Sequence, residues 1–582
     1  MLCKIIYKPI ISLITSLTIV LLYSFQEPIN PIPKTMANIV RDIYAKGIAD
    51  RFQNINQHDI LAYLDASSLH ILAHEYWTFD VNTEVDVFVC RDIQQKEVPF
   101  WLLKDSFQQT KELISNENVT YEVWRKRFKK GKVNLGINGF DRHRYVYFVA
   151  IKATNKSIEL AIKPIWPLDQ VVEPLHVGSV IYKDWDELTV NQFTPALEGA
   201  YILPTYRGRS REAHLIKAFR QTDYPSSSVP DQLLLSWIDD PQTSQHISWR
   251  TRNDLASSSF IYWREGTLDT LQAMVEVQEI HDVMLVNDPI VNRLSVSLTG
   301  LEPNTKYNYQ LISNAIKSKV YSFTTAPKSN DFEFGWFGDM HNDPSLGLFI
   351  PRWKKMFPNA NFYLQAGDLV NTGLYRDHWD ILWNATKSIT DEKPFMSVPG
   401  NHDSQEALFP WMYLSYLKFP ANGPSQLPKG LSYTFDYGNT LFLMVDAVTF
   451  SAKEQEAWIR DVLSSSTKRF KIVFFHFAPH TFESSYADII QYWQPLFVKY
   501  DVDLICNGHF HYYHKTTNPS LPRYIMSVAT KRKGEDIEGD DEAYIVQKGY
   551  LYQHVKISDS SLELCSVDSL GLVIDQFKIN KN

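Results

Sequence analysis

The sequence predicts a multidomain α+β protein in which two β-sandwich-like domains precede a layered α/β domain. Its 582 residues, 44% of them hydrophobic, are enough for about three or four packed units. Roughly the first half carries short apolar runs separated by turn residues, which is typical of antiparallel sheets. In the last part, strand-like runs alternate with amphipathic helices, which is typical of an α/β layer.

The overall charge argues against nucleic acid as a partner. The chain has 66 acidic and 58 basic residues, giving a net charge of -8. A negative surface repels phosphate backbones, so we expect no nucleic-acid binding. A small phosphorylated substrate would need local positive charge, such as metal ions. The sequence does not indicate an oligomeric state.

The N-terminus is predicted to direct export. Lys4 and Lys8 precede an apolar stretch over residues 10–25, so residues 1–25 are either a signal peptide or an uncleaved membrane anchor. The chain is therefore expected to be periplasmic, secreted or membrane-anchored outside the cytoplasm. Residues 26–34 contain three prolines and are expected to form an extended linker.

Residues 35–225 are predicted to form a β-rich domain of unknown role. Runs such as 85–89 and 145–151 have the composition of strands. The basic, aromatic stretch 124–132 resembles surfaces that bind anionic polymers, although a solvated strand end is the commoner explanation. Association with a membrane or envelope polymer remains an open alternative.

Residues 226–327 have the pattern of a fibronectin III-like sandwich. Strand-like runs at 232–237, 247–251, 260–263, 293–298 and 320–325 are separated by turn signals. Tyr307 follows a turn, where its hydroxyl can hydrogen-bond to the upstream backbone.

Residues 328–582 contain the side chains that are suited to metal binding and catalysis. Six strand-like runs occur here, and five of them end on side chains that can bind metal. The carboxyl ends of strands in an α/β layer border the usual active-site crevice. Helices are predicted between the strands, including 452–466, with Ser451 and Glu454 as a capping box, and 486–500. The ligand candidates are Asp339, His341, Asp368, Asn401, His476, His509 and His511.

These seven side chains exceed the needs of one metal ion. Carboxylates combined with imidazoles suit Mn, Fe or Zn better than Ca or Mg. A shared carboxylate can hold two ions about 3.5 to 4 Å apart, an arrangement that generates hydroxide and stabilises phosphoryl displacement. We therefore expect two divalent metal ions of undetermined identity and a hydrolytic reaction.

The motifs carry a specific resemblance. The segments 338–341, 367–368, 400–403, 476 and 508–511 resemble the signature of calcineurin-like metallophosphoesterases. The preceding segment 230–327 resembles the N-terminal domain of purple acid phosphatases. The resemblance implies a metal-dependent phosphohydrolase, either a phosphatase or a phosphodiesterase.

The resemblance also implies a role for each residue. Asp339, His341 and His511 would bind one metal, and Asn401, His476 and His509 the other. Asp368 would bridge the two ions, and a hydroxide between them would be the nucleophile. His402 would lie over the substrate, as an acid or transition-state stabiliser.

One position departs from the purple members, in which a metal-binding tyrosine follows the second aspartate. This chain has Asn371 there, and His341 is expected to take over as ligand. Asn342, His378 and His480 lie beside the motifs and are candidates for substrate binding.

Two alternatives to an active phosphoesterase remain. The chain could be a cell-surface attachment protein in which the phosphoesterase domain is secondary, or a catalytically silent relative that keeps its metals. The intact His402 favours an active enzyme. Neither substrate identity nor the choice between monoester and diester can be read from the sequence.

Overall fold

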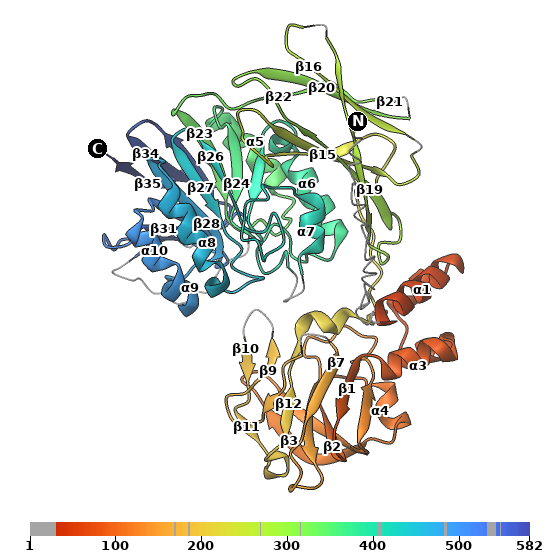
Figure 1. The fold of residues 1–582 in the computed structure, drawn as a ribbon. Coiled ribbons are helices and arrows are strands. Elements are labelled where there is room, and N and C mark those ends of the chain that lie inside the picture. Colours follow the sequence, from red (N-terminus) through yellow and green to blue (C-terminus); the bar gives the residue numbers. More distant parts are fainter. Residues whose placement is uncertain are drawn as a thin grey trace, which may run out of the picture.

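The chain folds into three successive units, which Figure 1 shows in orange, green and blue-green. The computed structural model describes residues 31–581 except 168–169, 184–186, 256, 268, 315, 405–408, 482–485, 532–542 and 547–548. The expected signal or anchor at 1–25 lies outside the described residues. Within the described part of the chain, none of the helices is long and apolar enough to span a bilayer.

The expected proline-rich linker is wrong for residues 31–34. Helix α1 spans Pro31–Ala45, so Pro31 and Pro33 lie in its first turn. Proline fits this position because first-turn N–H groups have no acceptor within the helix. Ile32, Met36 and Ile43 lie on the buried stripe of α1.

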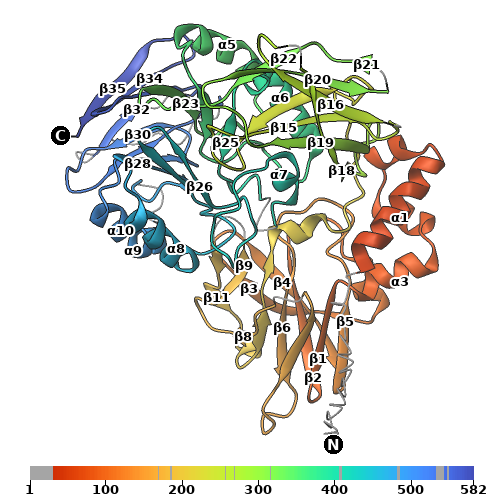
Figure 2. The same cartoon turned by 45° about the horizontal axis from the view of Figure 1, so that its top comes forward.

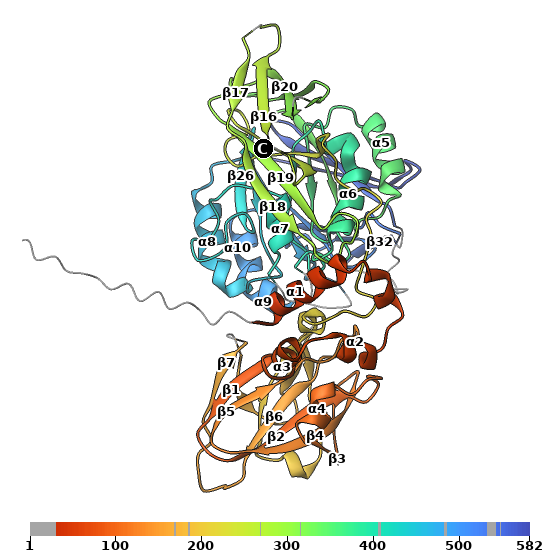
Figure 3. The ribbon, with the colours of Figure 1, turned by 90° about the vertical axis from the view of Figure 1, so that its right-hand side faces the viewer.

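The N-terminal domain is β-rich, with three helices gathered at one end. A seven-stranded sheet has the order β11-β3-β4-β2-β6-β12-β8, and a three-stranded sheet has the order β5-β1-β7. Figure 3 shows α1, α2 and α3 on the side of this domain that lies toward the other two units. The elements are α2 Gln57–Tyr63, α3 Ala66–His74, α4 Phe100–Lys104, β1 Trp77–Val81, β2 Val85–Asp92, β3 Gln108–Ser115, β4 Thr120–Phe128, β5 Gly131–Leu135, β6 Phe148–Ala153, β7 Ile162–Trp166, β8 Glu173–Pro174, β9 Val180–Lys183, β10 Glu187–Thr189, β11 Gln192–Phe193, β12 Tyr201–Leu203 and β13 Thr205–Tyr206.

The second unit is a β-sandwich. Its two sheets have the orders β14-β15-β19-β18 and β17-β16-β20-β21, with β22 also paired to β20. Trp249, Phe260 and Tyr309 fill the space between the sheets. The backbone N–H of Glu302 donates to Tyr307 Oη at 3.0 Å, as expected for a tyrosine after this turn. The strands are β14 Asp231–Ser236, β15 Gln245–Arg252, β16 Ser258–Arg264, β17 Leu271–Ala273, β18 Glu276–His281, β19 Ile290–Leu298, β20 Lys306–Ser313, β21 Ile316–Lys317 and β22 Tyr321–Thr324.

The third unit packs two mixed sheets around a large apolar core. One sheet has the order β25-β24-β23-β33-β34-β35, and the other β26-β27-β28-β29-β31-β30-β32. Strands β23, β24 and β25 are parallel, as are β27, β28, β29 and β31. The strands are β23 Phe332–Phe337, β24 Phe362–Gln365, β25 Phe395–Ser397, β26 Tyr433–Tyr437, β27 Thr440–Met444, β28 Phe470–Phe477, β29 Leu504–Gly508, β30 Tyr513–Thr516, β31 Arg523–Met526, β32 Ala543–Val546, β33 Tyr552–Ile557, β34 Ser561–Val567 and β35 Val573–Asn580.

Helices flank these two sheets, as Figure 2 shows for α5, α6 and α8. The capping box at Ser451 and Glu454 is formed at the start of α8. The helix expected at 486–500 is broken at Trp493, because Pro495 cannot continue a helix from the preceding turn. The helices are α5 Leu346–Met356, α6 Arg376–Thr390, α7 Trp411–Tyr416, α8 Ala452–Ser465, α9 Ala487–Tyr492 and α10 Gln494–Lys499.

Buried ion pairs attach the sandwich to helix α6. Arg250 of β15 contacts Asp380 of α6 at 2.8 Å and Asp231 at 2.6 Å. Arg376 contacts Asp380 from the same helix at 3.2 Å. Because buried charges are costly without partners, this set fixes α6 against the sandwich.

Candidate active site

All seven candidate ligands converge where the two sheets of the third unit meet. Strands β23, β24 and β25 of one sheet lead into Asp339, Asp368 and Asn401. The other sheet supplies His476 from β28 and His509 just after β29. The site is therefore built from strand ends that are distant in sequence, as the strand-end rule predicts.

Three side chains form the first ligand group. His511 Nε2 lies 3.3 Å from Asp339 Oδ2, and His341 Nε2 lies 3.6 Å from the same oxygen. The two Nε2 atoms are 3.1 Å apart. Asp339 is fully buried, whereas the side chain of His511 is 19% exposed, so the group faces solvent on the His511 side.

A second ligand group lies next to the first. Asn401 Oδ1 is 3.0 Å from His476 Nε2 and 3.1 Å from His509 Nδ1. Asp368 Oδ2 lies 3.3 Å from His476 Nε2 and 3.6 Å from His341 Nε2. Asp368 thus contacts both groups, which is the position that a bridging carboxylate requires.

These two groups fit divalent metal ions. Ligand atoms held 2.0 to 2.2 Å from a tetrahedral ion are about 3.3 Å from one another. The spacings of 3.0 to 3.6 Å between the donor atoms agree with that value. In addition, Asp339 Oδ2 is buried without a hydrogen bond of good geometry, which is costly unless a cation compensates it.

The backbone around the ligands is strained. His341, Asp368 and His509 have positive φ angles of 46°, 59° and 84°. For residues other than glycine, this left-handed conformation costs of order 1 to 3 kcal/mol and clusters at functional sites. At Gly508, a Cβ atom would lie 2.2 Å from Asp339 Oδ1, so only glycine fits.

The carboxylate of Asp368 is held in its charged form. Burial alone would raise the pKa of Asp368, but the positive charge of His476 outweighs it and holds the pKa well below its usual range. Burial would likewise lower the pKa of His476, whereas the charge of Asp368 raises it to about 9. Without metal this pair therefore keeps a proton, which metal binding must displace.

Two other histidines are held in their neutral form. Burial lowers the pKa of His341 to about 4 and that of His509 to about 3. A neutral imidazole has a lone pair available for a metal ion. His509 N also donates to Asp339 Oδ1 at 2.7 Å, which links the two ligand groups through the backbone.

His402 lies beside the shared carboxylate. Its backbone N–H donates to Asp368 Oδ1 at 2.8 Å, and its ring centroid is 4.7 Å from that of His341. Its Nδ1 atom lies 2.8 Å from the carbonyl oxygen of Asn371. Because a carbonyl only accepts, Nδ1 carries the proton of this bond, and Nε2 is the ring atom on the opposite edge.

The three substrate-binding candidates lie in different surroundings. Asn342 Oδ1 accepts the backbone N–H of Asn371 at 2.8 Å, so this side chain supports a loop of the site. His378 packs its ring against Tyr375 at the start of α6, 5.4 Å between centroids. His480 instead bonds to Gln494 of α10 at 2.7 Å and packs against Tyr524.

Asn371 is the residue expected to stand where purple members have a metal-binding tyrosine. Its Nδ2 donates to the carbonyl oxygen of His341 at 3.0 Å. The side chain therefore stabilises the loop of a candidate ligand, His341, through the backbone.

Sequence reasoning assigned no role to two further residues. Asp403 accepts backbone N–H groups of Leu369, Val370 and Gly400, and so joins two ligand loops. Burial raises its pKa to about 8. Tyr486 Oη lies 2.7 Å from His509 Nε2, on the ring edge opposite Asn401. The adjacency of Asp403 to His402 was the one signal available.

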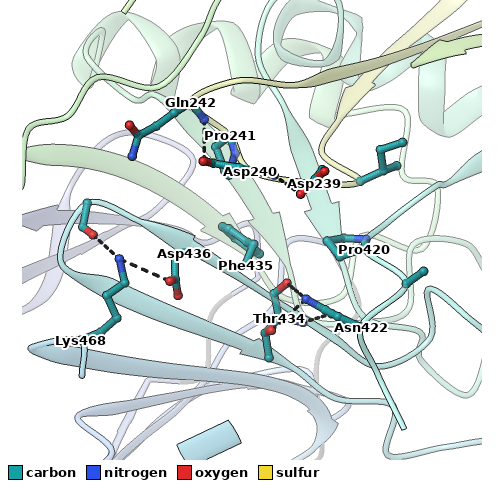
Figure 4. Close-up of a pocket in the computed structure, with 13 residues that line it drawn as sticks. Asp239, Asp240, Pro241, Gln242, Pro420, Asn422, Thr434, Phe435, Asp436 and Lys468 are labelled. Carbon is teal, nitrogen blue, oxygen red and sulfur yellow. Dashed lines mark hydrogen bonds and ion pairs between the residues drawn. The ribbon is translucent and has the colours of Figure 1, made fainter. Parts of the chain in front are cut away.

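A separate cleft of about 630 Å³ lies at the seam between the sandwich and the third unit (Figure 4). Its charged side chains already have partners. Lys468 contacts Asp436 at 3.3 Å, and Asp240 Oδ1 accepts the N–H of Gln242 at 2.9 Å. None of the residues that line the cleft belongs to the ligand groups.

Comparison with known protein families agrees with the division between the β-sandwich and the third unit. Residues 332–513 match the calcineurin-like phosphoesterase family. Residues 230–325 match the N-terminal domain of purple acid phosphatases. The first segment contains the seven ligand candidates and His402, and the second corresponds to the β-sandwich.

Individual proteins are similar to this chain over these regions. An uncharacterised protein of Mycobacterium tuberculosis is 24% identical over 323 residues, 47% of this chain and 60% of that protein. Purple acid phosphatase 23 of Arabidopsis thaliana is 24% identical over 66% of this chain and 92% of its own length. The structure of a purple acid phosphatase from yellow lupin seeds matches 87% of this chain and 94% of the lupin chain, with a TM-score of 0.54 and 14% identity. The chain thus carries a calcineurin-like phosphoesterase domain preceded by a purple acid phosphatase N-terminal domain.

Proposed function

We propose that this chain is a metal-dependent phosphohydrolase that cleaves phosphate monoesters or diesters. The observation that carries the proposal is Asp368, whose Oδ2 lies between His341 of one ligand group and His476 of the other. A carboxylate shared by two groups of nitrogen and oxygen donors is the arrangement that two-metal phosphoesterases use. The family assignment of residues 332–513 supports the same activity.

The ligands would hold two divalent ions, of Mn, Fe or Zn. Asp339, His341 and His511 would bind one ion, and Asn401, His476 and His509 the other, with Asp368 common to both. When bound, such ions acidify water into a nucleophile and offset the charge of the phosphate. The opening beside His511 would admit the ester toward this face.

His402 would act on the leaving group. Its Nδ1 proton is held by the carbonyl oxygen of Asn371, which fixes the orientation of the ring. A protonated Nε2 could then donate to the departing oxygen or stabilise charge in the transition state.

The proposal is tested on the full chain reconstituted with Mn. We expect hydrolysis of p-nitrophenyl phosphate, of bis(p-nitrophenyl) phosphate, or of both. An Asp461→Asn variant, changed on the exposed face of α8, serves as control and should retain full activity. A metal-loaded protein that cleaves neither ester would refute the proposed activity and favour a silent or attachment role.

We also propose that the chain works outside the cytoplasm, on a phosphorylated small molecule or polymer. The support is the sequence of residues 1–25, in which Lys4 and Lys8 precede an apolar stretch. Fusion of these residues to a reporter that is active only after export tests the proposal. Retention of the reporter in the cytoplasm would contradict it.

A further inference from the structure

A loop just before α6 contacts His402 through two hydrogen bonds. His402 Nδ1 donates to the carbonyl oxygen of Asn371, and the N–H of Gly373 donates to the carbonyl oxygen of His402, each at 2.8 Å. At Gly373 a Cβ atom would lie 2.0 Å from the carbonyl oxygen of Asp403, so the loop packs directly on the His402 segment. A shift of residues 371–373 would therefore move the His402 ring.

The same loop ends at Tyr375, which the N-terminal domain contacts. The Tyr375 N–H donates to the carbonyl oxygen of Thr372 at 3.0 Å, closing the loop into a turn. Arg211 of the N-terminal domain donates to Tyr375 Oη. The guanidinium of Arg220 lies over the Tyr375 ring, 3.7 Å from its centroid.

Arg220 is itself held in place by charges from two other units. It pairs with Asp282 of the sandwich at 2.6 Å and with Asp377 of α6. Asp282 also accepts the backbone N–H of Arg376 at 3.0 Å. The three units therefore meet at the first turn of α6, directly after the loop that contacts His402.

We propose that Arg211 is a positioning residue of the phosphoesterase centre, acting through Tyr375 and the loop 371–375 on the orientation of His402. This inference rests on the proposed function of His402 and gives the N-terminal domain a role in that reaction. The Arg220 guanidinium lies over the face of the Tyr375 ring, and Arg211 donates a hydrogen bond to the Tyr375 hydroxyl. The ring is therefore restrained from two directions. A displacement of a proton donor by about 1 Å can lower the reaction rate roughly 10²-fold.

The test compares two substrates in the full chain. Phenyl phosphate has a poor leaving group that needs a proton, whereas p-nitrophenyl phosphate needs little help. In Arg211→Gln and Tyr375→Phe we expect kcat on phenyl phosphate to fall roughly 10- to 100-fold. On p-nitrophenyl phosphate we expect kcat to fall less than about threefold, with KM unchanged on both esters.

Arg127→Gln is the matched control. Arg127 lies in the same domain with its side chain 54% exposed and pairs with Asp86 at 3.0 Å, so its loss should leave both rates unchanged. Hydrogen exchange supplies a second measurement that does not depend on turnover. Amides of residues 371–378 should exchange faster in Arg211→Gln than in Arg127→Gln.

His402→Ala separates this inference from the proposed function. If that variant loses phenyl phosphate turnover selectively and Arg211→Gln does not, the inference is wrong and the function stands. If His402→Ala shows no dependence on the leaving group, the proposed role of His402 fails first. A rise in KM on both esters for Arg211→Gln would assign Arg211 to substrate binding and overturn the positioning role.

Discussion

Asp368 Oδ2 lies 3.3 Å from His476 Nε2, and the pair joins the end of β24 in one sheet to β28 in the other. The same oxygen faces His341 at 3.6 Å. The two-metal interpretation depends on this carboxylate more than on any other side chain.

Asp368→Ala is expected to lose bound metal from both groups. No neighbouring side chain can replace a carboxylate shared by two ions, so the donors that remain would be incomplete on each side. Elemental analysis of the purified variant should find well under one equivalent per chain. Two full equivalents would refute the bridging role, and Asp461→Asn should bind as the unmodified chain does.

His402→Ala is expected to keep its metal and lose rate. The His402 side chain lies beside the two ligand groups, but its proposed role is to act on the leaving group. Metal content should therefore stay near that of the unmodified chain. A positioned proton donor contributes roughly 10² to 10⁴ in kcat. Steady-state kinetics together with elemental analysis check this, and loss of metal would show that His402 is a ligand.

The protein is expected to be colourless. Its activity should be lost on chelation and restored by Mn. A tyrosinate bound to ferric iron gives purple colour, but the corresponding position is Asn371, which bonds to the His341 backbone. Tyr375 Oη is engaged by Arg211. Neutral imidazole in place of phenolate should favour divalent ions, and divalent pairs acidify water less than ferric pairs do.

If the bound ions are divalent, hydrolysis is expected to have a neutral to mildly alkaline pH optimum. The visible spectrum of the iron-loaded protein and a pH–rate profile after EDTA treatment and Mn addition measure both properties. A strong mid-visible band together with an optimum near pH 5 would contradict this prediction.

Asp380→Ala is expected to destabilise the fold by about 3 to 5 kcal/mol, because it leaves Arg250 and Arg376 buried without their shared partner. Urea unfolding measures the change. The control is Asp254→Ala, which removes an exposed ion pair with Arg252 and should cost less than about 1 kcal/mol. Equal effects in the two variants would show that the α6 junction does not depend on these charges.

Asp391→Asn is expected to stabilise the protein at neutral pH. Burial raises the pKa of Asp391 to about 6, against a usual value of 3.8, so its charged form is disfavoured in the folded state. Its contribution to stability is therefore full below about pH 4 and is lost as pH rises through 6. The gain should reach up to about 3 kcal/mol at pH 7.5 and be smaller at pH 5. Urea unfolding at both pH values checks the sign, and a gain that grows toward acid pH would contradict it.

The predicted fold class is confirmed, and the reason lies in local pattern. Runs such as 332–337 became strands at the predicted residues, because apolar continuity and the following glycine are both local signals. The seven ligand candidates are brought together because each lies at or just after the end of a strand in one of the two sheets that meet here. Their proximity could therefore be predicted without knowing the conformation of the loops.

Other features depend on contacts that no local pattern encodes. The helix beginning at Pro31 differs from the predicted linker, because its stability comes from burying Ile32 and Ile43 against the domain. His480 bonds to Gln494 only because α10 packs beside it. The contact of Arg211 with Tyr375 joins residues 164 positions apart across two domains, a distance at which sequence gives no guidance.

The most direct test of the two-metal centre is titration of the metal-free full chain with Mn, following bound metal and ester hydrolysis together. The two ligand groups sharing Asp368 predict binding of two equivalents per chain, with hydrolysis of p-nitrophenyl phosphate or its bis-ester developing as the second site fills. Saturation at one equivalent or fewer, or full occupancy without hydrolysis of either ester, would contradict the account.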